Sequence, residues 1–202
     1  MVKEIIRKQI EKYRKYKHRK IVQSAINNGL TLGQNVTIMD NVRFDPPHNS
    51  LISIGDNTTI GPEVAFIAHD ATTFKPLNYG RIGFITIGND CFIGERSILL
   101  PGIEIGSKCI IGAGSVVSKD IPDGSIAIGN PCHVVGSYDD FLKKQTSKIE
   151  SGIRVEYAKL YNDIVSNVRE IKANNKDLKI FYSKGQSGKK LRSHFRFNIT
   201  ED

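Results

Sequence analysis

A six-residue period constrains the fold of this chain more than any other feature. One position of each repeat is aliphatic or aromatic, and in the longest run these positions are Ile87, Ile93, Leu99, Ile105, Ile111 and Val117. The same period occurs upstream at Leu32, Ile38 and Phe44, and again at Ile54, Ile60 and Phe66. Glycine often follows this position, and Asn or Asp often comes next.

Each repeat has the composition of a short strand followed by a tight turn. The aliphatic residue points inward, while Gly, Asn and Asp tolerate the backbone conformations that a sharp corner requires. A unit of six residues cannot bury its own apolar face, so successive repeats must stack. The sequence therefore predicts a continuous ladder of aliphatic side chains inside a stack of short strands.

The repeats, together with the closing segment "IGAGSVVSKDIPDGSIAIGNPCHVV", resemble the hexapeptide-repeat acyltransferases. The resemblance covers about residues 30–136, and the closing segment is similar to the sugar O-acetyltransferase branch, with its maltose, galactoside and nodulation-type enzymes. It implies an all-β core that is a left-handed parallel β-helix with three short strands per turn. It also implies a homotrimer with the active site between chains.

The net charge of +8 is distributed unevenly along the chain. Residues 1–29 carry nine Lys/Arg against two Asp/Glu, residues 30–138 carry six against ten, and residues 139–202 carry fourteen against nine. The central part is acidic, which argues against a nucleic-acid-binding core. We therefore expect no nucleic-acid partner.

The two ends of the chain have helical rather than six-residue periodicity. Residues 1–29 are predicted to form a basic amphipathic helix whose apolar stripe, with Ile6, Ile10 and Tyr13, packs on the β-helix. Attraction of this helix to an anionic membrane surface is the alternative. A second apolar stripe, from Ile149 to Ile171, predicts a C-terminal helical extension over residues 139–182. Residues 183–202 are basic and are expected to form a mobile tail.

The chain contains three cysteines, and none of them forms a CxxC pair. Their number and spacing do not suggest a disulfide framework. No apolar stretch is long enough for a signal peptide or a membrane span. We expect a cytoplasmic protein. Cys91 and Cys109 lie one turn apart in the implied fold, so they are expected to be stacked core residues rather than metal ligands.

Two insertions interrupt the repeat. The step from Phe44 to Ile54 is ten residues instead of six, and the step from Phe66 to Ile87 is twenty-one, so that residues 67–84 must leave the stack as a loop. Functional groups are often carried by loops on a rigid scaffold. The insertions are therefore the first places to look for a site.

His69 lies at the start of the longer insertion. In the enzymes that the chain resembles, a histidine at this place is the general base that activates an acceptor hydroxyl for attack on acetyl-CoA. Imidazole suits this chemistry because it titrates near neutral pH. Asp45 and Asp70 are both candidates to orient the ring, and for Asp70 a capping role in the loop is the alternative.

The resemblance also implies contacts to the two substrates. For the acceptor, Phe92 stands where the family often has tryptophan, and Glu95 is either a ligand of the acceptor or a solvated corner carboxylate. For acetyl-CoA, the backbone amides near Ala113, Gly114 and Ser115 are expected to bind the pantetheine arm. Lys119 is expected to bind phosphates, and His133, where the family more often has Lys or Arg, to bind them more weakly or with pH dependence.

These observations predict an acetyl-CoA-dependent O-acetyltransferase acting on a carbohydrate hydroxyl, in surface-polysaccharide biosynthesis. Amino-sugar N-acetylation, serine acetylation and a non-catalytic binding scaffold are the alternatives. The γ-type carbonic anhydrases share the implied fold, but their zinc site requires a close histidine pair. The histidines at 18, 48, 69, 133 and 194 include no such pair in the sequence, so no metal is expected.

Overall fold

The computed structural model describes residues 2–151, 154–156 and 182–184. The chain divides into two compact units, of which the first includes residues 1–138 and the second residues 139–194. The first unit contains helix α1 (Val2–Asn27) and the repeat region. Each unit is described separately.

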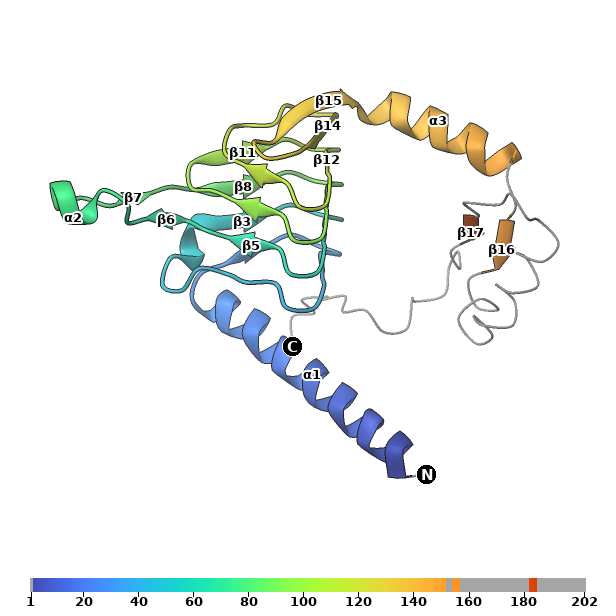
Figure 1. The fold of residues 1–202 in the computed structure, drawn as a ribbon, viewed down its shortest axis with the longest axis horizontal. Coiled ribbons are helices and arrows are strands. Elements are labelled where there is room, and N and C mark those ends of the chain that lie inside the picture. Colours follow the sequence, from blue (N-terminus) through green and yellow to red (C-terminus); the bar gives the residue numbers. More distant parts are fainter. Residues whose placement is uncertain (1, 152–153, 157–181, 185–202) are drawn as a thin grey trace. The chain divides into compact units, whose positions relative to one another are not determined.

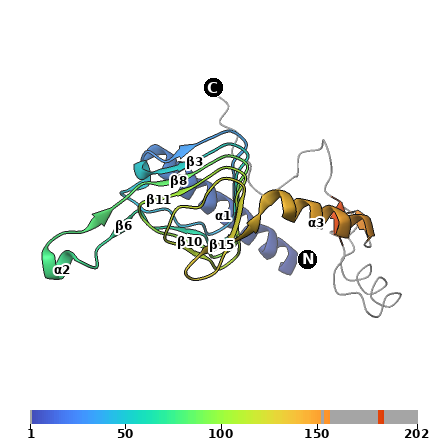
Figure 2. The ribbon, with the colours of Figure 1, turned by 90° about the horizontal axis from the view of Figure 1, so that it is seen from above.

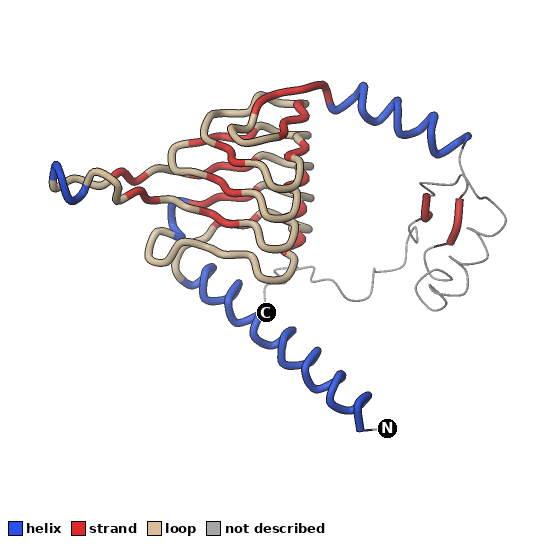
Figure 3. Tube along the Cα trace, viewed as in Figure 1, coloured by secondary structure: helices blue, strands red, loops and turns tan. Residues whose placement is uncertain are grey.

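The repeat region forms a stack of coils with three parallel sheets (Figures 1 and 3). The first sheet contains β1 (Thr31–Leu32), β3 (Ile52–Ile54), β8 (Ile85–Ile87) and β11 (Ile103–Ile105). The second contains β2 (Thr37–Ile38), β4 (Thr59–Ile60), β9 (Phe92–Ile93), β12 (Ile110–Ile111) and β14 (Ser125–Ile128), with β15 (His133–Ser137) added antiparallel. The third contains β5 (Ala65–Phe66), β10 (Ile98–Leu99) and β13 (Val116–Val117).

The chain visits the three sheets in a fixed order, and each strand pairs with the strand one coil away. β9, for example, pairs with β4 on one side and with β12 on the other, and all three are parallel. This arrangement confirms the predicted left-handed parallel β-helix.

The core is the predicted aliphatic ladder. The repeat positions from Ile38 onward are buried, apart from Phe44, which like Leu32 is partly buried and packs against the core. Cys91 and Cys109 are buried free thiols, as expected for stacked core residues. The Cys91 thiol donates to the carbonyl of Gly106, at an Sγ–O distance of 3.0 Å.

The corner between the first and second sheets, which we call the regular corner, repeats with the same geometry along the stack. It has a left-handed residue in each coil: Asn35, Asn57, Asp90, Lys108 and Gly124. Side-chain oxygens link successive coils here, since Asp56 Oδ1 accepts from the Gln34 amide and Asn89 Oδ1 accepts from the Asp56 amide, both at 2.7 Å. The coils approach closely, and a Cβ atom at Gly88 would lie 2.6 Å from the Ser107 nitrogen.

The corner between the third and first sheets, which we call the broken corner, carries both insertions. The first insertion contains a 3-10 turn over Asn49–Leu51. The second is a hairpin that projects from the stack in Figure 1. In this hairpin β6 (His69–Asp70) pairs antiparallel with β7 (Arg81–Ile82), and the short helix α2 (Phe74–Leu77) lies at the tip.

Helix α1 packs on the repeat region through a different face from the one predicted. Val22 and Ala25 are buried in the core, whereas Ile6, Ile10 and Tyr13 are about half exposed or more. Contact with the β-helix is therefore made by the C-terminal part of α1. The predicted stripe is left open to solvent in the single chain.

The second unit contains helix α3 (Tyr138–Ser151) and two strands, β16 (Arg154–Glu156) and β17 (Tyr182–Lys184), which pair in parallel. The prediction of a continuous helix from Ile149 to Ile171 is therefore wrong at residues 154–156. Gly152 disfavours propagation of a helix, and the apolar periodicity does not reflect this. The rest of that stripe and residues 185–202 of the predicted tail lie outside the described residues. Among the helices described, none is long and apolar enough to cross a bilayer.

Candidate active site

The broken corner brings Asp45 and His69 together because their insertions leave the stack in consecutive coils. Arg43 and Ala65 form a parallel bridge, and the rings of Phe44 and Phe66 stack with centroids 5.3 Å apart. Paired strands are about 4.8 Å apart, so segments that depart just after these residues begin as neighbours. Figure 2 shows the coils from above, with the hairpin leaving one corner.

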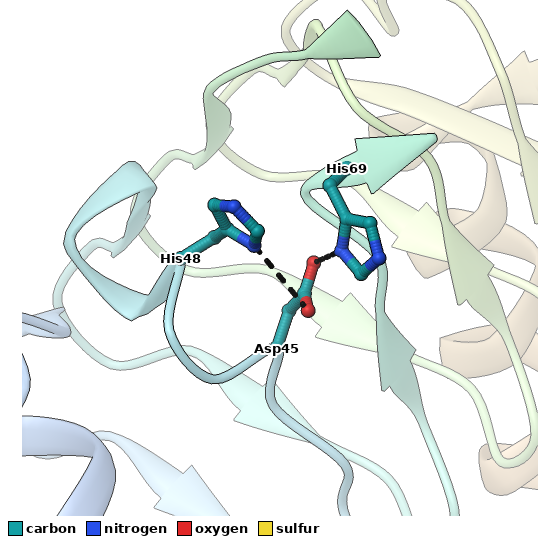
Figure 4. Close-up of side chains that lie close together, drawn as sticks. All are labelled: Asp45, His48 and His69. Atoms are coloured by element: carbon teal, nitrogen blue, oxygen red, sulfur yellow. Dashed lines mark hydrogen bonds and ion pairs between the residues drawn. The ribbon is translucent and has the colours of Figure 1, made fainter. Parts of the chain in front are cut away.

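Asp45 and His69 form a short hydrogen bond. The distance between Asp45 Oδ2 and His69 Nδ1 is 2.7 Å, and the Ala68 amide donates to the same oxygen at 2.7 Å. The Asp45 side chain is buried, with 8% of it exposed, whereas 46% of the His69 side chain is exposed. A carboxylate on Nδ1 therefore holds the ring from the buried side, as Figure 4 shows.

The ionisation of Asp45 decides which nitrogen of His69 is free. Burial opposes ionisation, but hydrogen bonds from His69 and from the Ala68 amide outweigh it and hold the pKa of the Asp45 carboxyl below its ordinary value. An ionised carboxylate can only accept, so His69 Nδ1 must donate. In the neutral ring Nε2 is then the unprotonated nitrogen, which can accept a proton from a substrate.

His48 is a third member of this cluster, and it was not predicted. Its Nδ1 lies 3.7 Å from Asp45 Oδ1, and its ring centroid lies 4.8 Å from that of His69. The histidines include no close pair in the sequence, but the fold brings His48 and His69 together. The two residues are 21 positions apart in the sequence. The one available signal was that each lies in an insertion at the same phase of the repeat.

Asp70 does not orient His69. Its Oδ1 accepts from the Thr72 amide at 2.9 Å, and its Oδ2 lies 3.7 Å from Arg81 Nη2 across the hairpin. The hydrogen bonds to Thr72 are the main reason that the pKa of the Asp70 carboxyl is lowered. The structure thus favours the capping role over the orienting role for Asp70, and Asp45 holds the ring instead.

The residues expected at the acceptor lie away from the broken corner of the same chain. Phe92 is on β9 in the second sheet, with 47% of its surface exposed. Glu95 lies at the corner between the second and third sheets, where its carbonyl accepts from the Gly114 amide at 2.8 Å. Its carboxylate is 3.8 Å from Arg96 Nε. Neither side chain has a contact with His69 or Asp45 among the interactions of the described residues.

The residues expected to bind acetyl-CoA lie in different parts of the β-helix. Ala113 and Gly114 lie at the same corner as Glu95. The Ser115 hydroxyl is buried, donating to the Gly112 carbonyl at 2.6 Å and accepting from the Gly129 amide at 3.1 Å, so it has a structural role. His133 is exposed on β15. Lys119 is exposed and follows β13, on the side of the broken corner.

The comparisons with known proteins point to one family. Residues 84–119 match the family model "Hexapeptide repeat of succinyl-transferase". Galactoside O-acetyltransferase of Escherichia coli K12 is 36% identical over 125 residues, covering 59% of this chain and 58% of that protein. Protein CapG of Staphylococcus aureus is 46% identical over 98 residues, covering 46% and 57%. A solved galactoside acetyltransferase in complex with coenzyme A is 32% identical, covers 56% of this chain and 67% of that one, and has a TM-score of 0.49.

The matches are confined to part of each protein. The chain spans about half the length of the curated relatives that it matches. Residues 84–119 thus match the hexapeptide-repeat family model, and the chain is similar in sequence over 125 residues to a galactoside O-acetyltransferase.

Proposed function

We propose that this chain is an acetyl-CoA-dependent O-acetyltransferase that acts on a carbohydrate hydroxyl, with His69 as the general base. The Asp45–His69 hydrogen bond is the observation that carries the proposal, because it orients an exposed imidazole with a buried carboxylate. The similarity of the β-helix to galactoside O-acetyltransferase supports the type of reaction and the class of acceptor.

The proposed reaction needs no covalent enzyme intermediate. His69 Nε2 accepts the proton of the acceptor hydroxyl while that oxygen attacks the thioester carbonyl carbon of acetyl-CoA. The tetrahedral intermediate collapses, the carbon–sulfur bond breaks, and the imidazolium returns the proton to the leaving thiolate. Asp45 stabilises the imidazolium and keeps Nδ1 as the donor.

We propose that the complete site lies between chains of a homotrimer. In one chain the Asp45–His69 pair is at the broken corner, whereas Phe92, Glu95 and Gly114 are on the second sheet or at the corner beyond it. A heterologous ring would bring the broken corner of one chain against the second sheet of the next, uniting the two groups. Sedimentation that gives a fully active monomer would contradict this arrangement.

For the donor, we propose that the backbone near Ala113, Gly114 and Ser115 binds the pantetheine arm and that Lys119 and His133 meet the phosphates. The exposure of both basic side chains is compatible with this role. We further propose a cytoplasmic enzyme of surface-polysaccharide synthesis. The three free cysteines fit a reducing compartment.

We also propose that α1 attracts the enzyme to anionic membranes. Lys12, Lys17 and Lys20 are exposed on it beside the open apolar stripe. Vesicles containing anionic lipid should retain the wild-type protein, and charge reversal at Lys12, Lys17 and Lys20 should release it. Equal retention of the reversed variant would remove this role of α1.

The experiment that tests the proposed function is an acetyl-transfer assay. The protein is incubated with acetyl-CoA and, separately, with neutral sugars, amino sugars and serine, and free thiol release is followed together with the mass of the acceptor. We expect release with a neutral sugar and an ester-linked acetyl group in the product. An amide product or acetylserine would favour the corresponding alternative. Failure to bind acetyl-CoA would favour a non-catalytic scaffold.

A further inference from the structure

We propose that Asp45, His48 and His69 form a binding site for a divalent transition-metal ion, best suited to Zn²⁺, and that a bound ion inhibits the enzyme. Each residue offers one ligand atom, and these atoms all lie within 4.8 Å of one another. Two imidazole nitrogens and one carboxylate oxygen are a ligand set that Zn²⁺ uses in sites with an open fourth position. This site goes beyond the proposed reaction, which uses no metal.

His48 adds a third ligand atom to those of His69 and Asp45, so the three residues can chelate an ion. Its Nδ1 is buried and, within the described residues, has no hydrogen-bond partner, although Figure 4 shows it directed at the Asp45 carboxylate. An unpartnered buried nitrogen is costly, and the proposed acetyl transfer makes no use of it. A metal ion between His48 and Asp45 would satisfy this nitrogen.

Binding one ion requires the side chains to move, because their ligand atoms are spread over up to 4.8 Å. Ligands bonded at about 2.0 Å to a tetrahedral ion lie roughly 3.3 Å from one another. The distance of 3.7 Å between His48 Nδ1 and Asp45 Oδ1 must shorten slightly, and the 2.7 Å between Asp45 Oδ2 and His69 Nδ1 must lengthen. The Ala68 amide already holds the carboxylate from behind, as outer partners of metal ligands commonly do.

Inhibition follows from the identity of the ligands. An ion held by Asp45 and His69 displaces the proton from Nδ1 and takes over the carboxylate that orients the ring, so the pair can no longer act as a base. This consequence rests on the proposed function, whereas binding of the ion does not.

The binding test uses the intact protein, purified with a chelator and then titrated with Zn²⁺ against a chromogenic chelator. We expect about one ion per chain and a loss of affinity of at least about a hundredfold in His48→Ala. His48→Phe preserves the ring without the nitrogen and should lose the same affinity, which guards against a local collapse in the alanine variant. His133→Ala, at an exposed histidine outside the cluster, should bind like the wild type.

Co²⁺ provides a second readout that does not depend on activity. The wild-type complex should show visible absorption bands of a low-coordinate ion, and both His48 variants should lack them. Equal Zn²⁺ affinity in wild type and His48→Phe, or loss of binding in His133→Ala, would overturn the site. In the transfer assay Zn²⁺ should reduce wild-type turnover and EDTA should restore it. Tight binding without inhibition of an active enzyme would overturn the inhibitory role, and absence of transfer with intact binding would count against the proposed function alone.

Discussion

The regular corner and the broken corner are built from the same repeat, but their polar side chains bind different groups. At the regular corner the oxygens of Asp56 and Asn89 accept backbone amides of neighbouring coils, so these side chains hold the stack together. At the broken corner Asp45 also accepts a backbone amide, from Ala68, but the same oxygen binds an exposed imidazole. At the regular corner these polar groups connect neighbouring coils, whereas at the broken corner the buried carboxylate of Asp45 also orients the exposed ring of His69.

The comparison shows how a repetitive scaffold can carry chemistry. The coils stack closely at both corners, since a Cβ atom would lie 2.6 Å from the Ser107 nitrogen at Gly88 and closer still to the Gly102 nitrogen at Gly83. Insertions are accommodated at the broken corner, where the chain can leave the stack and return to it. Because the coils on both sides remain in register, residues from consecutive insertions meet at a defined spacing.

The largest loss of turnover is expected when the charge of Asp45 is removed. Asp45→Asn should lower turnover at least about tenfold and up to about ten-thousandfold, since an amide no longer enforces the tautomer of His69. Asp56→Asn is the matched control at the regular corner, where an amide oxygen can still accept from Gln34. Turnover is measured in the acetyl-transfer assay. Equal losses in the two variants would mean that the corners do not differ in function.

A second comparison adds one methyl group at each corner. Gly88→Ala places a Cβ 2.6 Å from the Ser107 backbone nitrogen, and we expect the free energy of unfolding to fall by about 1–3 kcal/mol. Gly80→Ala, in the hairpin, places its nearest contact at 3.4 Å and should change stability by less than about 0.5 kcal/mol. Chemical denaturation of both variants provides the measurement. A similar loss at Gly80 would contradict the open surroundings of this position in the hairpin.

Substitution of a left-handed residue of the regular corner should lower the free energy of unfolding by a smaller amount. Asn57 has a φ of 56°, so Asn57→Ala should cost about 1 kcal/mol of the free energy of unfolding. Asn57→Gly loses the same side-chain hydrogen bond with Asn35 but adopts this conformation readily, and it should be closer to wild type. If both variants are equally unstable, the side chain rather than the backbone conformation is responsible.

The smallest effect concerns acid stability. The pKa of Asp45 is lowered in the folded chain, so the stability that this carboxyl contributes is present above the unfolded pKa of about 3.9 and is lost as the pH falls through the lower folded value. Between about pH 5 and pH 2 the wild type should lose more stability than Asp45→Asn. Thermal unfolding across this range checks the prediction. Parallel curves for the two proteins would argue against an ionised, hydrogen-bonded Asp45.

Most of the β-helix was predictable because its signal is local and repeated. Gly, Asn and Asp recur shortly after the inward positions and indicate the turns, and each aliphatic position from Ile87 to Val117 could be assigned without knowing any distant contact. Helix α1 was also visible, but its packing face was not. Val22 and Ala25 are buried where α1 leads into the first coil. The spacing of apolar residues does not specify how the helix meets that coil.

The site was predictable only in part. His69 could be proposed because it begins the second insertion, where the family resemblance implies a base, and Asp45 because it lies in the first insertion. The choice between Asp45 and Asp70 required the register of the coils. His48 was missed because its proximity to His69 depends on how the first insertion folds back in a 3-10 turn. At the other end of the chain, β16 was missed because its partner β17 is far away in the sequence.

Turnover of His69→Ala, measured beside Asp70→Asn, decides whether His69 is the base. We expect both variants to fold and to bind acetyl-CoA. His69→Ala should lose about a hundredfold to ten-thousandfold in turnover, and Asp70→Asn should stay within a few-fold of wild type. The wild-type rate should also rise with pH through the range in which imidazole loses its proton, and His69→Ala should lose this dependence. Near-normal turnover in a folded, acetyl-CoA-binding His69→Ala protein would exclude His69 as the base.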